Sequence, residues 1–66
     1  MEFKATLKEL RTQKGISQKE LAAKTGFSLS AVVKWETGQY EPRAKVLIAL
    51  SKYFGVSIDF LLGNID

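Results

Sequence analysis

The sequence predicts an all-α fold in which five short helices pack as an orthogonal cluster. The chain has 66 residues, the size of one small domain, so we expect a single domain over residues 1–66. Five glycines and one proline divide it into short segments. Within these segments the apolar residues recur at helical spacing, and none alternates apolar and polar residues as a strand would.

The first two helices are each predicted by an apolar stripe and a terminal glycine. The first covers Glu2–Lys14, ends at Gly15, and repeats its apolar residues at i, i+4 and i+7: Phe3, Leu7, Leu10. The second covers Ser17–Thr25 and ends at Gly26. It begins with the capping-box pattern S-x-x-E and turns two small or branched residues inward: Leu21, Ala22.

The last three helices follow the same rules. Ser28 should cap a helix over Ser28–Thr37 that buries Val32 and Trp35, with a possible staple between Phe27 and Val32. The next helix should carry Pro42 in its first turn and cover Arg43–Phe54. Its expected inward residues are Ala44, Leu47, Ile48, Leu50 and Phe54, and a fifth helix is expected over Ser57–Leu62.

The composition argues against an enzyme, a metal site and a cofactor. The chain has no Cys and no His, and its seven acidic residues are scattered. Nucleophilic thiols, zinc sites and the commonest general base are therefore absent. The longest apolar run, Val46–Leu50, is far below the ~20 residues that span a membrane. We expect a cytoplasmic protein.

Positive charge is concentrated in the first half of the chain. Residues 1–34 hold seven of the ten Lys/Arg but only three of the seven Asp/Glu, and the net charge is +3. This bias indicates a polyanionic partner.

The spacing from Gln18 to Trp35 predicts a helix-turn-helix. Two short helices joined by a tight turn must cross closely, which requires the small Ala22 and, at Gly26, a positive φ. Four larger apolar residues would clamp the unit to the core: Leu21, Phe27, Val32, Trp35.

Residues 3–62 resemble the lambda-repressor-like, Cro/CI-type (XRE) DNA-binding domains of phage and bacterial regulators. The matching stretches are 7–11, 14–22, 26–28, 35–38, 41–42 and 54–62. The resemblance implies a sequence-specific transcriptional repressor that places its recognition helix, Ser28–Thr37, in the DNA major groove. The alternative is a protein-interaction module, such as an antitoxin-like domain, built on the same fold.

The resemblance also implies which residues touch DNA bases: Leu29, Ser30, Val33 and Lys34. Leu29 and Val33 depart from the usual polar set and offer only apolar contact, such as to thymine methyls; otherwise they serve core or subunit packing. Ser30 can donate or accept, and Lys34 can reach guanine or a phosphate.

The implied phosphate contacts are Gln18, Lys19, Ser28, Gln39, Tyr40 and Arg43. Gln18 is also expected to brace the recognition helix, and Ser28 to act as a helix cap as well. Tyr40 packs either on the DNA backbone or on its own domain.

The resemblance leads to two more expectations, which concern structure. Arg11 and Glu36 form a partly buried ion pair, and Thr25 stands where the family has an apolar residue, which weakens packing there.

The C-terminal region is expected to mediate a homodimer that binds an inverted-repeat operator. Val46 and Ala49 stand where polar residues are more usual in the family. Further apolar residues near the end of the chain complete the core or line a two-fold interface: Tyr53, Val56, Ile58, Phe60, Ile65.

Overall fold

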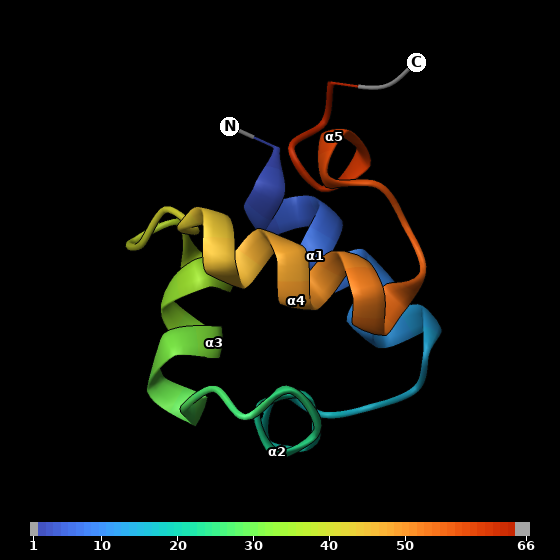
Figure 1. Cartoon of the computed structure of the whole chain (residues 1–66). Helices are drawn as coiled ribbons and strands as arrows, with labels where there is room; N and C mark the ends of the chain where they lie inside the picture. The colour runs from blue at the N-terminus through green and yellow to red at the C-terminus, as the bar shows by residue number, and fades with distance from the viewer. Residues whose placement is uncertain (1, 65–66) are drawn as a thin grey trace.

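The computed structural model describes residues 2–64 and contains five helices and no strand within that range. The all-helical fold is thus confirmed. The helices are α1 (Phe3–Gln13), α2 (Gln18–Thr25), α3 (Leu29–Thr37), α4 (Ala44–Phe54) and α5 (Ile58–Leu61). Figure 1 shows α2 end-on while α3 lies in the plane of the view, so the two cross at a steep angle.

Serine side chains fix the starts of three helices. Ser17, Ser28 and Ser57 are N-caps whose hydroxyls accept a backbone N–H three residues on. At Ser17 the reciprocal bond from its own N–H to the Glu20 carboxylate completes the predicted capping box. These serines therefore lie just outside the helices that the sequence predicted to include them.

One core joins all five helices. It consists of nine buried side chains: Phe3, Leu7, Leu21, Ala22, Val32, Trp35, Leu47, Leu50 and Leu61. The ring of Phe27 meets Trp35 edge-to-face at 5.2 Å between centroids, which holds the α2–α3 turn to the core. α3 packs against both α1 and α2, so its position depends on each of them.

The prediction for the start and inner face of α4 was wrong in three places. Pro42 does not lie in the first turn, because the helix begins after Arg43, its N-cap. Ala44 is exposed, and Ile48 is 46% exposed. The buried positions are Leu47 and Leu50, and a residue next to Leu47 is turned by about 100° from it. Ile48 therefore faces outward, while Val46 is partly buried against the core.

Thr25 does not leave an unsatisfied polar group between α2 and α3. Its hydroxyl donates a 2.7 Å hydrogen bond to the carbonyl of Leu21, within its own helix. The side chain is half-buried, and its hydroxyl is therefore not left as a free donor.

The two ends of the described chain touch. A methyl group added at Gly63 would come within 2.5 Å of the Cβ of Glu2, so only glycine fits there. Figure 1 accordingly shows the start of α1 and the segment after α5 on one side, with α2 on the opposite side. Ile65 lies outside the described residues.

Candidate nucleic-acid interface

A tight turn of three residues sets the angle between α2 and α3. Gly26 adopts a left-handed φ of 80°, and its N–H donates to the carbonyl of Ala22. Ser28 follows in extended conformation and caps α3 by accepting from the N–H of Ala31. A side chain at position 26 would strain this conformation. The geometry is therefore that of the helix-turn-helix that the sequence predicted.

The outward face of α3 carries the four side chains expected to touch bases. Val32 and Trp35 are buried, which leaves the opposite side of the helix open. Leu29, at 45% exposure, and Ser30 are the most accessible, whereas Val33 and Lys34 are half-buried. Positions i, i+1, i+4 and i+5 share one helical face, so the four side chains form one strip: Leu29, Ser30, Val33, Lys34.

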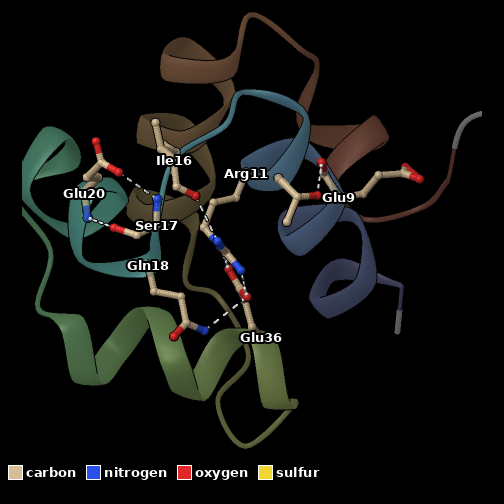
Figure 2. A network of polar contacts seen from close by, with 8 residues as sticks. Glu9, Arg11, Ile16, Ser17, Gln18, Glu20 and Glu36 are labelled. Carbon is tan, nitrogen blue, oxygen red and sulfur yellow. Dashed lines mark hydrogen bonds and ion pairs between the residues drawn. The ribbon is translucent and has the colours of Figure 1, made fainter.

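A polar network behind this strip ties α3 to α1 and α2. Arg11 donates from Nε to Glu36 Oε2 at 2.7 Å and from Nη2 to Glu36 Oε1 at 3.0 Å. Its Nη1 donates to the carbonyl of Ile16 at 2.9 Å. Gln18 adds a 3.2 Å bond from Nε2 to Glu36 Oε1. Figure 2 shows the three side chains converging between the helices.

The network is nearly closed to solvent. The side chains of Arg11 and Glu36 are 12% and 4% exposed. The hydrogen bond and charge of Glu36 raise the pKa of the Arg11 guanidinium further above its ordinary value, against the opposing effect of burial. Among residues 2–64 no buried side-chain nitrogen or oxygen lacks a hydrogen-bond partner, so the network acts as a brace that holds α3 to α1 and α2.

The expected phosphate contacts differ in how free their side chains are. Gln18 is half-buried and committed to Glu36, and the Ser28 hydroxyl serves as a cap. Gln39 donates to the Thr37 hydroxyl at 3.1 Å. Lys19 and Arg43 are exposed. Of the exposed members, Ser28 precedes α3, Lys19 lies in the first turn of α2, and three follow α3 in the chain: Gln39, Tyr40, Arg43.

One contact at the interface was not expected from the sequence. Lys34 Nζ donates to the hydroxyl of Tyr40 at 3.3 Å and lies 4.8 Å from the centroid of its ring. In the sequence, Lys34 and Tyr40 lie on either side of the turn glycine Gly38. This spacing is only a weak signal that their side chains meet. Two open grooves, of about 160 and 450 Å³, flank the tyrosine and both include Trp35 and Glu41 in their walls.

Other kinds of site find no support in the described part of the chain. Across residues 2–64, no group of three or more His, Cys, Asp or Glu side chains is placed to hold a metal ion. No helix in that range is both long and apolar enough to cross a membrane.

Comparison with known proteins gives one family. A family model described as helix-turn-helix matches residues 7–61. The chain is 44% identical to the HTH-type transcriptional activator BcrR of Enterococcus faecalis over 97% of its own length and 31% of that protein's. It is 45% identical to YonR, a prophage-derived HTH-type transcriptional regulator of Bacillus subtilis, over 91% of its own length and 56% of the relative's.

An archaeal relative is covered more completely. An uncharacterized HTH-type transcriptional regulator of Methanocaldococcus jannaschii is 36% identical over 86% of each chain. By contrast, the chain spans only about a third to a half of the length of the first two relatives. No solved structure matches the chain.

Proposed function

Because the chain belongs to the helix-turn-helix family, we propose that it binds double-stranded DNA sequence-specifically and regulates transcription. The observation that carries this proposal is the strip on α3. It faces outward and is exposed at Leu29 and Ser30, while the hydrogen bonds of Glu36 hold the helix to α1 and α2. An α-helix with side chains is about 10–12 Å wide, close to the ~12 Å width of the major groove. A groove-reading helix needs this combination of exposure and rigidity.

The start of α3 is the part best suited to reading base edges. Leu29 offers an apolar surface that complements thymine methyl groups, and Ser30 offers a hydroxyl that donates or accepts. Val33 extends the apolar contact one turn on, and Lys34 can donate to guanine. Together these four side chains would read about four base pairs.

Phosphate contacts would hold α3 in register. Lys19, in the first turn of α2, and Arg43, the N-cap of α4, are exposed cations, and Gln39 and the N-terminus of α3 at Ser28 add uncharged donors. Gln18 would reach a phosphate only while keeping or exchanging its bond to Glu36. For Tyr40, the contact with Lys34 favours packing on its own domain over packing on the DNA backbone.

We propose further that two copies pair through their C-terminal helices and bind an inverted repeat. Three large apolar side chains of α4 and α5 remain open to solvent: Ile48 at 46%, Ile58 at 37% and Phe60 at 39%. Two half-sites would lie about one helical turn of DNA apart. Occupying a promoter in this way would repress transcription.

The alternative is a protein-interaction module that uses the same face. The exposed Leu29 beside half-buried Val33 would then meet an apolar protein surface, and a net charge of +3 does not oppose this. The two functions make different demands on Ser30 and Lys34, which matter to DNA far more than to an apolar partner.

Selection from a random pool of DNA duplexes at physiological salt tests the proposal, since non-specific phosphate binding is weak there. Enrichment of an inverted repeat would support a dimeric DNA reader, and enrichment of a single half-site a monomeric one. A Ser30→Ala/Lys34→Ala variant should lose the enrichment. A Lys52→Ala variant, which removes a charge at the far end of α4, should keep it. No enrichment by the unaltered protein would overturn the proposal in favour of the protein-interaction module.

The direction of regulation needs its own assay. Transcription in vitro from a promoter that contains the selected sequence should fall as the protein is added. A rise would instead agree with the Enterococcus relative, which is named a transcriptional activator.

A further inference from the structure

The turn after α3 is folded so that Tyr40 comes back onto Lys34. Gly38 ends the helix with a left-handed φ of 82°. The N–H groups of Gln39 and Tyr40 then both donate to the carbonyl of Lys34, at 2.9 and 3.2 Å. The backbone therefore brings residue 40 back beside residue 34, independently of any attraction between the two side chains.

The lysine side chain is directed away from the base-reading end of the helix. Side chains in an α-helix lean toward its N-terminus, and in a helix-turn-helix that end contacts the base edges. The ammonium of Lys34 instead reaches the hydroxyl and ring face of Tyr40, a residue that follows α3. To touch a guanine, the ammonium has to leave the tyrosine.

Tyr40 binds the ammonium of Lys34 only weakly. It is neutral and 50% exposed, and its hydroxyl is the one hydrogen-bond partner of the Lys34 ammonium within the described residues. Glu41 follows directly in the chain, yet among residues 2–64 the ion pair found is that of Arg11 and Glu36. A carboxylate would hold the ammonium more firmly, because a charge-assisted hydrogen bond is stronger than an exposed cation–π contact.

We propose that Tyr40 is a specificity-determining residue that acts through Lys34. It holds the ammonium at the C-terminal end of α3 and so weakens the preference for guanine that Lys34 would otherwise impose. The inference rests on the proposed DNA-binding function, and it gives Tyr40 a positioning role in place of a direct contact with DNA.

Substitution of both residues tests the proposal. Selected duplexes that differ only at the base pair facing Lys34 would be measured with the unaltered protein, Tyr40→Leu, Lys34→Ala and the double variant. Removing the ring should raise the preference for guanine about two- to fivefold, the strength of an exposed cation–π contact. The same Tyr40→Leu change made together with Lys34→Ala should alter no base preference.

A matched control separates the ring from the hydroxyl. Tyr40→Phe keeps the face on which the ammonium lies and loses the acceptor, so its preference for guanine should fall between those of the unaltered protein and Tyr40→Leu. Proton NMR of the free protein adds a readout that needs no DNA. The ε-methylene protons of Lys34 should be shifted upfield by the ring in the unaltered protein and in Tyr40→Phe, but not in Tyr40→Leu.

Two results would overturn the proposal, and they are distinguishable. If Tyr40→Leu weakens binding equally for every sequence, with and without Lys34→Ala, then Tyr40 contacts DNA itself and the DNA-binding function stands. If the unaltered protein distinguishes no sequence, the proposed function and the role of Tyr40 fail together. Because Tyr40 is outside the core, an unchanged melting temperature should show that all variants are folded.

Discussion

Two basic residues of this small protein, Arg11 and Lys34, are held in opposite ways. Arg11 is 12% exposed in its side chain and binds a carboxylate at two points and a carbonyl at a third. Lys34 is half-buried, and its ammonium makes a solvent-exposed contact with a neutral ring. A charge that is buried and fully paired fixes helices in place but is not available to a ligand. A charge that is exposed and weakly paired can be given up to one.

The largest effect should come from breaking the buried pair. Arg11→Ala leaves the nearly buried carboxylate of Glu36 with only the Gln18 amide as donor, so the free energy of unfolding should fall by about 3 kcal/mol. Denaturant unfolding followed by circular dichroism would measure this. Lys8→Ala, on an exposed face of α1, is the matched control and should change it by less than about 0.5 kcal/mol. An unchanged melting temperature for Arg11→Ala would contradict the inference that this ion pair stabilises the packing of α3 against α1.

A smaller loss is expected from Gln18→Ala. The variant keeps the ion pair but removes the bond that ties α2 to Glu36, at a cost of about 1 kcal/mol in unfolding free energy. Thermal unfolding monitored against Lys19→Ala, the exposed neighbour on α2, would isolate the effect. If Gln18→Ala weakens DNA binding while its stability equals that of Lys19→Ala, then Gln18 contributes to DNA binding and not to stability. The polar network would then join α3 to α1 but not to α2.

The smallest effect should follow loss of the exposed pair. Lys34→Ala removes a surface contact with a neutral ring, so the unfolding free energy should change by less than about 0.5 kcal/mol. Differential scanning calorimetry at low and at physiological salt would show it. A loss as large as that of Gln18→Ala would mean that Lys34 holds the turn after α3 in place, and the contrast between the two cations would disappear.

The sequence predicted the helices well because their boundaries depend on local chemistry. Serine caps, the capping box at Ser17 and the left-handed glycines act within a few residues of themselves. Which residues form the outer face of α4 was harder to predict. Leu47 and Ile48 are adjacent and equally apolar, and only packing against the other helices decides which of them is buried.

The candidate site could likewise be predicted only in part from the sequence. The pairing of Arg11 with Glu36 could be expected because the resemblance placed both residues, although they are 25 positions apart. The resemblance also led us to expect that Gln18 braces α3. The acceptor to which Gln18 donates, and the return of Tyr40 onto Lys34, depend instead on side-chain directions and on one turn. Neither follows from residue type and spacing, since a glutamine or a tyrosine beside a helix end has several partners within reach.

The contact between Glu2 and Gly63 makes the described chain almost a closed ring. A short linker across that contact would cost little loop entropy, so the helices should tolerate circular permutation with new ends in the α1–α2 loop. The same closure suits the fold to insertion into another protein, because a host chain would enter and leave it at one point.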